Sequence, residues 1–162
     1  MIGPITSSHH AAILKMNADF VHWLAPLNQA GLDRMLERAA YGRQIDNGQG
    51  VLVGYADTVD YPDHENLNWL RGRYTSFFYI DRVIIAKEAH GRGYGQRLYD
   101  DVECFAREQG YTYLTCEVNT QPDNPGSHRF HLARGFEAAG TQSYPSNANG
   151  FSKAVKYYAK AL

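Results

Sequence analysis

The chain has 162 residues, of which 44% are apolar, and this combination fits one domain over residues 1–162 and excludes an intrinsically disordered chain. Its formal net charge of −1 gives no electrostatic reason to expect a nucleic acid or an anionic membrane as a partner. The sequence has no run of about 20 apolar residues to span a bilayer and no basic-then-apolar signal peptide, so we expect a cytoplasmic protein.

The N-terminal part predicts two helices. Ser7 or Ser8 provides the N-cap of the first helix, which runs towards Phe20, and Asn28 provides the N-cap of the second. Apolar residues of the second helix recur three or four positions apart and therefore share one face.

Two short strands, Tyr41 to Asp46 and Val51 to Ala56, flank the turn sequence Asn-Gly-Gln-Gly and predict an antiparallel hairpin. Residues 57–75 form a long connection for a compact domain, and such connections often act as lids or binding walls. A short helix is expected around residues 66–70. Aromatic and basic residues here suggest a bound molecule with a flat or anionic part, but packing of Trp69 on the sheet explains the aromatic residues equally well.

A strand over residues 76–85 is followed by a glycine-rich turn and an amphipathic helix. Gly91, Gly93 and Gly95 remove Cβ atoms where the helix begins, so its unpaired N–H groups can approach an anion closely. Apolar residues recur at helical spacing from Tyr94 onwards, and Gly110 is expected to end the helix. The turn is therefore a predicted phosphate cradle.

The spacing of these glycines differs from two common phosphate-binding patterns. The dinucleotide pattern Gly-x-Gly-x-x-Gly needs a glycine where Gln96 stands, and the Gly-Lys-Ser/Thr ending of the P-loop is missing. The turn resembles instead the pyrophosphate-binding signature of the GCN5-related N-acetyltransferase (GNAT) superfamily, Gln/Arg-x-x-Gly-x-Gly/Ala, placed on His90, Gly93 and Gly95. His90 departs from the signature at its first position, which matters little where the backbone carries the phosphate contacts.

A second stretch of the chain resembles the same superfamily. In the superfamily pattern an Asn precedes a short helix, and a Tyr stands four residues before Gly-Phe. Asn124 and the Gly135-Phe136 pair match this pattern, whereas His131 stands at the place of the Tyr. The resemblance implies that Asn124 caps the helix and contacts the coenzyme, with Asn119 as the competing candidate for that contact.

The resemblance also implies a fold. It is an α/β (α+β) fold in which a mixed, mostly antiparallel sheet has a central parallel pair splayed to admit CoA, with helices flanking the sheet. The strand predicted at Tyr111 to Val118 follows a helix, so it should run parallel to the strand at residues 76–85. Two final strands, Phe136 to Tyr144 and Lys153 to Lys160, should form an antiparallel pair joined by a polar loop at residues 145–150.

The activity implied by the resemblance is N-acetyl transfer from acetyl-CoA, as co-substrate, to an amine by direct attack. The end of the central strand would pair with the pantetheine arm, and the glycine turn would hold the pyrophosphate. The implied coenzyme-binding residues are Val83, Ile84, Ile85, Gly91, Arg92, Gly93, Tyr94, Gly95, Gln96 and Asn124. No metal is expected, because neither the two cysteines nor His128 and His131 stand in a clustered ligand pattern.

Two residues are candidates for proton transfer. Glu117 aligns with a place where some relatives carry a general base, although a carboxylate bonded to the backbone or to an arginine explains it equally well. His131 either donates a proton to the leaving sulfur or packs on its helix. The candidate acceptor-binding residues are Tyr79, Asp81 and Trp69, and Tyr79 and Asp81 are also alternative candidates for the base.

The acceptor is expected to be a small-molecule amine or a peptide amine, and the sequence does not identify it. A homodimer is an open expectation. The missing tyrosine keeps a second class of function open, an acyl-CoA-binding sensor or regulatory subunit with little turnover. Acetyl-CoA binding without acceptor-dependent thiol release would distinguish the sensor from the enzyme.

Overall fold

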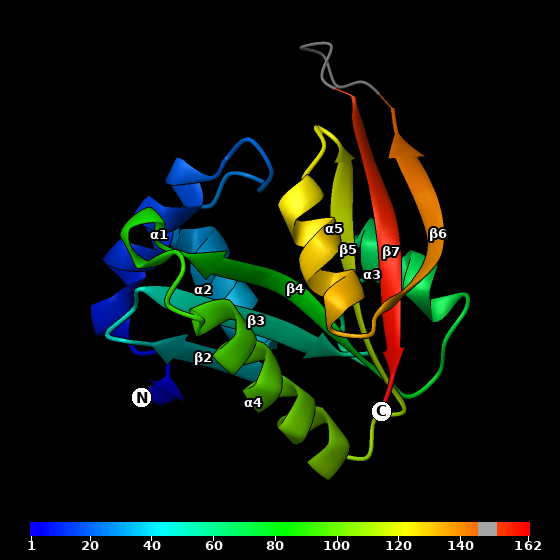
Figure 1. Ribbon diagram of the computed structural model, residues 1–162, viewed down its shortest axis with the longest axis horizontal. Helices are drawn as coiled ribbons and strands as arrows, with labels where there is room; N and C mark the ends of the chain where they lie inside the picture. Colours follow the sequence, from blue (N-terminus) through cyan, green and yellow to red (C-terminus); the bar gives the residue numbers. More distant parts are fainter. Residues whose placement is uncertain (146–151) are drawn as a thin grey trace.

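The computed structural model describes residues 1–145 and 152–162, and these form one seven-stranded sheet with helices on both faces (Figure 1). The strand order is β1-β2-β3-β4-β5-β7-β6, and within it only β4 and β5 run parallel. The strands are β1 (Ile2–Pro4), β2 (Tyr41–Ile45), β3 (Gly50–Ala56), β4 (Phe77–Ile85), β5 (Tyr113–Gln121), β6 (Glu137–Tyr144) and β7 (Lys153–Ala161). The predicted mixed sheet with a central parallel pair is confirmed.

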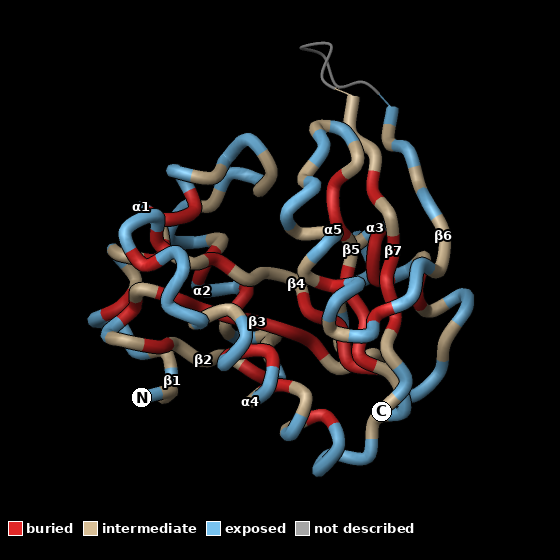
Figure 2. The backbone as a smooth tube through the Cα atoms, viewed as in Figure 1, coloured by how far each residue is buried: buried red, intermediate tan, exposed pale blue. Residues whose placement is uncertain are grey.

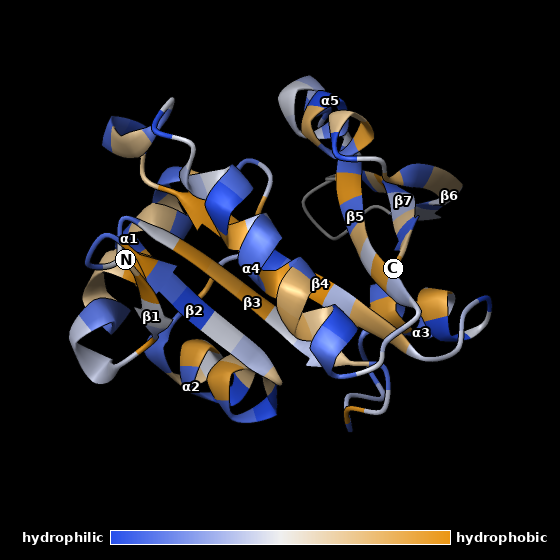
Figure 3. Cartoon of the chain, turned by 60° about the horizontal axis from the view of Figure 1, so that its bottom comes forward, coloured by the Kyte–Doolittle hydropathy of each residue, from blue (hydrophilic) through white to orange (hydrophobic). Residues whose placement is uncertain are grey.

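Helices cover the sheet in two layers. One layer contains α1 (His10–Asp19), α2 (Gln29–Arg38) and α3 (Glu65–Arg71), and the other contains α4 (Tyr94–Glu108) and α5 (Pro125–Ala133). Each layer closes its own apolar cluster, with Leu32 and Tyr79 in the first and Leu98 and Phe78 in the second. Buried residues accordingly follow the central strands, and α4 turns an apolar stripe to the sheet (Figures 2 and 3).

The two N-terminal helices begin differently. Asn28 caps α2 as predicted, because its side-chain oxygen accepts a hydrogen bond from the Gly31 N–H at 2.8 Å. The predicted cap at Ser7 or Ser8 is wrong. A 3-10 turn at Ser7–His9 precedes α1, Thr6 is the residue that caps this turn, and both serines lie inside it.

The parallel strands β4 and β5 pair over a short length only. Their register begins at Phe77↔Tyr113 and ends at Tyr79↔Thr115, and within the described residues the rest of β4 pairs with β3 alone. The two strands diverge beyond this point (Figure 1). The splay that the resemblance implied is therefore present.

A β-bulge marks the same place on the other side of β4. Val53 of β3 stands opposite Arg82, but the next residue, Gly54, stands opposite Ile80, so Asp81 is the extra residue. A bulge can turn consecutive side chains towards one face of a sheet. Asp81 and Arg82 both face the cavity on the side of α1 and α2, where Arg82 bonds Asn17 of α1.

Several boundaries differ from those predicted. The strand expected at Tyr111 to Val118 starts and ends later, as β5, and the short β1 was not predicted because three residues carry no periodic signal. The helix around residues 66–70 is confirmed as α3. The predicted loop at residues 145–150 lies outside the described residues except for Pro145.

Candidate active site

A cavity of about 690 Å³ opens where β4 and β5 diverge. A second hollow of about 470 Å³ follows the end of β4 towards the glycine turn. Seven residues line both of them: Trp23, Leu24, Val83, Tyr99, Asn124, Ser127 and His131. The two hollows therefore form one cleft with a strand end and glycine turn on one side and charged side chains on the other.

The edge of β4 facing the cleft offers backbone groups for pairing. Val83, Ile84 and Ile85 pair with β3 on one side and line the second hollow on the other. An extended ligand can pair with such an edge as though it were another strand. The carbonyl of Ile85 already accepts a hydrogen bond from Nε2 of His90 at 3.0 Å. The backbone groups of β4 that are open to a ligand therefore end at Ile85.

The glycine turn has the geometry of an anion site. Gly91 and Gly93 have φ angles of 80° and 75°, and a Cβ added at either would meet nothing within 4 Å. Gly93 is the N-cap of α4, a helix of 15 residues, so the N–H groups of Tyr94, Gly95 and Gln96 have no acceptor within the helix. These groups and the positive end of the helix dipole face an open space that suits a phosphate.

Two predicted coenzyme residues in this turn have side chains that point elsewhere. The Tyr94 hydroxyl donates to Oδ2 of Asp46 in the β2–β3 turn, and the Arg92 guanidinium lies 3.8 Å from the same carboxylate oxygen. Tyr94 can therefore serve the cradle through its backbone, while its side chain ties α4 to the hairpin.

Glu117 of β5 lies in the gap between the parallel strands. Its Oε2 accepts a hydrogen bond from the hydroxyl of Tyr79 at 2.6 Å. Burial raises the pKa of the Glu117 carboxyl to about 7, with a further contribution from the negative charge of Asp81. A carboxyl group with this pKa can exchange a proton near neutral pH.

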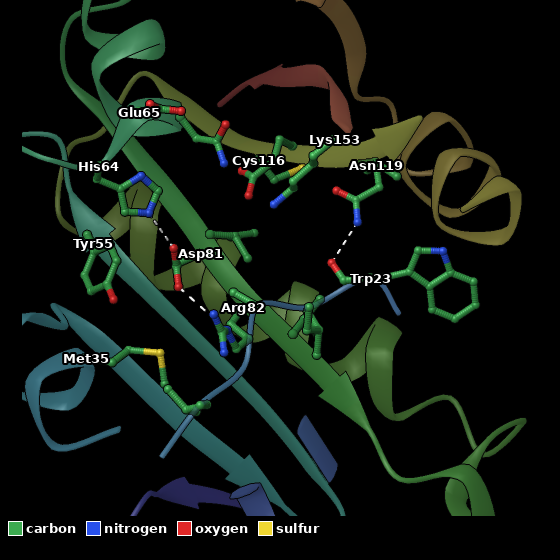
Figure 4. Close-up of a pocket in the computed structure, with 18 of the residues that line it drawn as sticks. Trp23, Met35, Tyr55, His64, Glu65, Asp81, Arg82, Cys116, Asn119 and Lys153 are labelled. Carbon is green, nitrogen blue, oxygen red and sulfur yellow. Dashed lines mark hydrogen bonds and ion pairs between the residues drawn. The ribbon is translucent and has the colours of Figure 1, made fainter. Parts of the chain in front are cut away.

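Asp81 belongs to a hydrogen-bonded group that sequence analysis did not assign (Figure 4). Nδ1 of His64 accepts from the Leu67 N–H at 3.2 Å, so Nε2 carries the hydrogen and donates to Oδ1 of Asp81 at 2.7 Å. On the other side, Nε of Arg82 lies 3.9 Å from Oδ2 of Asp81. The sequence did not single out His64 within the connection at residues 57–75, because its contact with Asp81 joins residues 17 positions apart.

His131 has both ring nitrogens engaged. Nδ1 donates to the carbonyl of Ser127 at 2.7 Å, and Nε2 accepts from the Tyr99 hydroxyl at 2.6 Å. Burial lowers the pKa of His131 to about 4, so the imidazole is neutral at pH 7. The predicted acid role remains a prediction, and this geometry favours the packing alternative.

The two candidates for the coenzyme-contacting asparagine have different partners. Asn124 caps α5, as the resemblance implied, with its Oδ1 at 3.4 Å from the Ser127 N–H. Asn119 instead donates from Nδ2 to the Trp23 carbonyl at 2.7 Å and holds the α1–α2 connection. Asn124 lines both hollows, so its coenzyme contact stays the better-supported prediction.

Trp69 lies away from the charged end of the cleft. Its ring stacks on Tyr157 of β7 with 3.9 Å between centroids, and the Arg73 guanidinium covers it at 3.6 Å. A Cβ at Gly140 of β6 would lie 2.5 Å from this ring. The structure thus favours the packing explanation of Trp69 over acceptor contact.

Glu117 and His131 approach the cleft from opposite faces of the sheet. Glu117 bonds Tyr79, which belongs to the apolar cluster under α1, α2 and α3, whereas His131 bonds Tyr99 in the cluster under α4 and α5. A reactive group held between β4 and β5 would therefore have a carboxylate on one side and a neutral imidazole on the other.

Within residues 1–145 and 152–162, no three His, Cys, Asp or Glu side chains gather in a way that could hold a metal ion. None of the helices described there is both long and apolar enough to cross a membrane. The expected cytoplasmic location and the homodimer remain predictions.

Comparison with known proteins agrees with the architecture. The model of the acetyltransferase (GNAT) family matches residues 14–136, while no curated protein matches the chain. The structure is similar to Ard1 from Thermoplasma volcanium, with a TM-score of 0.75 and 15% identity over 100% of this chain and 97% of the other. It is also similar to ribosomal-protein-alanine N-acetyltransferase from Brucella melitensis, with a TM-score of 0.71 and 20% identity over 100% and 99% of the two chains.

A third similar structure contains a ligand. Arabidopsis thaliana Naa50, in complex with the bisubstrate analogue CoA-Ac-MVNAL, has a TM-score of 0.70 and 14% identity over 100% of this chain and 98% of the other. At these identities the structural likeness shows the fold alone.

Proposed function

The chain belongs to the acetyltransferase (GNAT) family, and on that premise we propose that it transfers the acetyl group of acetyl-CoA to the nitrogen of an amine acceptor by direct attack on the thioester. The observation that carries the proposal is the position of Glu117 in the gap between β4 and β5, beside an unpaired strand edge that leads to the glycine turn. Direct attack needs no covalent enzyme intermediate.

The coenzyme end of the cleft would hold acetyl-CoA mainly through backbone groups. The pantetheine arm pairs with the β4 edge at Val83 to Ile85, and an N–H of this edge can polarise the thioester carbonyl. The pyrophosphate meets the N–H groups at the start of α4. Naa50 of Arabidopsis thaliana, with a bisubstrate analogue of CoA bound, provides a precedent for this ligand class on the same fold.

Glu117 would act as the general base. An amine must be neutral to attack, whereas an amine of pKa roughly 8 to 10 arrives mostly protonated at pH 7. With its pKa near 7, the Glu117 carboxyl is about half ionised at that pH and can accept the proton. The Tyr79 hydroxyl donates to Glu117 and stabilises its ionised form, which makes Tyr79 a positioning residue.

The leaving thiolate would need little help. An alkyl thiol such as that of CoA has a pKa of about 8.5, so the CoA thiolate leaves readily. His131 is neutral at pH 7, and its Nδ1–H is already donated to the Ser127 carbonyl. We therefore assign His131 to the support of Tyr99 and keep acid catalysis as the alternative to be tested.

The proposal is tested by binding and turnover together. CoA and acetyl-CoA should raise the melting temperature, while NAD and ATP at the same concentration should not, because only a ligand of the native state shifts the unfolding equilibrium. Free thiol should then appear in proportion to added amine, over a panel of amino acids, polyamines, aminoglycosides and peptides. Stabilisation by acetyl-CoA without amine-dependent thiol release would support the sensor and contradict the transferase.

A further inference from the structure

The end of the cleft away from the glycine turn, called here the acceptor end, is lined by charges of both signs. The positive residues are Arg34 and Arg38 of α2, Arg82 of β4 and Lys153 of β7. The negative residues are Asp63 and Glu65 near the start of α3, Asp81 of β4 and Glu117 of β5. Helix α2 therefore contributes only positive charge, and β5 only negative charge.

The helical phase of α2 produces this selection. Arg34 and Arg38 stand four positions apart and face the cleft together with Met35. The two acidic residues of the helix, Asp33 and Glu37, are exposed and lie off this face. Helix α2 thus has both acidic and basic side chains, but of these only the arginines line the cavity.

The two arginines of α2 have no carboxylate partner among the described residues. Within the described part of the chain no ion pair joins Arg34 or Arg38 to a carboxylate, and Arg38 packs instead over the ring of Tyr61 at 4.0 Å. Arg82 differs, because Asp81 lies 3.9 Å from its Nε and Asn17 accepts from its Nη1 at 2.7 Å. Arg34 and Arg38 are therefore the lining arginines without an ion pair, whereas Arg82 has Asp81 beside it although its buried Nε has no hydrogen-bond partner. Among the described residues Lys153 also has no ion pair, but it lies near Glu117, where its charge lowers the pKa of that carboxyl.

These arginines and the base lie on different walls. Met35, which shares their face of α2, lies with Arg82 across the cleft from Cys116 and Lys153 (Figure 4). Glu117 is the neighbour of Cys116 in β5 and points into the same cavity. A bound acceptor therefore meets a carboxylate at one wall and guanidinium groups at the other.

We propose that the acceptor is an amine that carries a carboxylate in the same molecule, with the amine at Glu117 and the carboxylate at Arg34 and Arg38. This inference rests on the proposed transferase function, since it names the acceptor of that reaction. A guanidinium binds a carboxylate through two parallel hydrogen bonds, which gives both strength and orientation. A second ammonium at the same place would be repelled, so polyamines and aminoglycosides are poor acceptors.

The test compares acceptors that differ at one end only. Thiol release is measured with glycine, β-alanine, γ-aminobutyrate and ε-aminocaproate, with the amino alcohol and diamine of each chain length, and with the peptide amide alanyl-alaninamide. Beyond glycine each amino acid and its amino alcohol have amines that titrate at similar pH, so base strength does not explain a difference between these two. The chain length with the highest kcat/KM reports the span from the base to the cation that binds the carboxylate.

The best amino acid should exceed its amino alcohol in kcat/KM by at least about tenfold, and its diamine by more. In the R34M/R38M double variant this ratio should fall to about one, mainly through a higher KM. The control is Arg107→Met, exposed at the far end of α4. Arg34 is exposed, so R34M alone provides the reading if the double variant loses its fold.

Each contrary result has a distinct meaning. Equal or faster turnover of amino alcohols, diamines or the peptide amide would overturn the inference and leave the transferase intact, as would an unchanged ratio in the arginine variants. Stabilisation by CoA without thiol release for any compound would overturn the transferase, and the inference with it.

Discussion

The two ends of the cleft are built from different parts of the chain. The proposed coenzyme end would bind mainly through backbone groups of one continuous stretch, from Val83 to Gln96, with Asn124 as the predicted side-chain contact. The acceptor end gathers side chains from α2, the start of α3, β4, β5 and β7. Backbone groups are the same in every residue, whereas each side chain brings its own charge. Coenzyme binding should therefore depend on the backbone geometry of the glycine turn. The choice of acceptor should depend on charged side chains that come from several elements.

The largest expected effect separates chemistry from coenzyme binding. Glu117→Gln should lower kcat by about 10²- to 10⁴-fold, because the amide cannot accept the proton, while the Kd for acetyl-CoA stays unchanged. Wild-type kcat should fall as the pH drops below about 7, where the carboxyl becomes protonated. Steady-state kinetics and calorimetry measure both quantities. An unchanged kcat beside a normal Glu137→Gln control would remove Glu117 as the base.

The next effect concerns the coenzyme end. Gly93→Glu should weaken acetyl-CoA binding by about 100-fold or more, because it places a carboxylate where the pyrophosphate binds. Gly110→Glu is a matched control: its φ is 83°, a Cβ there also meets nothing within 4 Å, and it lies past the other end of α4. Calorimetry gives the Kd. Equal losses in the two variants would indicate backbone strain rather than a phosphate site.

A third prediction tests whether His131 belongs to the chemistry. His131→Ala should lower the free energy of unfolding by about 2 to 4 kcal/mol, since it leaves a cavity and removes the partner of the Tyr99 hydroxyl. Turnover per folded molecule should change by less than about threefold. Denaturant unfolding and kinetics provide the two values. A loss of kcat of about 10- to 100-fold at wild-type stability would instead restore the acid role.

The same variant has a pH signature. The folded pKa of about 4 lies below the usual value of 6.5, so the unfolded chain binds more protons between these values. The stability contributed by neutral His131 is complete above pH 6.5 and is lost as the pH falls towards 4. The stability difference between wild type and His131→Ala should therefore shrink over this range.

The smallest expected effects are opposite shifts of the Glu117 pKa in two variants. Tyr79→Phe removes a hydrogen bond that lowers the pKa of Glu117, so the acid limb of the kcat profile should move to higher pH. Asp81→Asn removes a negative charge that raises this pKa, so the limb should move to lower pH. Turnover at pH 7 should change by up to about tenfold in either case. Shifts in the same direction would contradict the assignment of the limb to Glu117.

The sequence by itself determined the order of most elements and the local geometry of the glycine turn. Gly91 and Gly93 act within one turn of chain, where a missing Cβ and a positive φ decide how closely an anion can approach. Helical and strand periodicity are equally local, so α2, the hairpin and the helix after the turn were predicted. The first helix cap was missed because Thr6, Ser7 and Ser8 are all able to cap and only the 3-10 turn selects among them.

Only the tertiary structure decided which side chains line the proposed acceptor end. The contact between His64 and Asp81, the choice of Arg34 and Arg38 as lining residues, and the burial of Trp69 against Tyr157 all join distant parts of the chain. The raised pKa of Glu117 and the lowered pKa of His131 likewise come from burial on opposite faces of one sheet. Charge, burial and hydrogen bonding depend on distance in space, and residue spacing along the chain does not specify that distance.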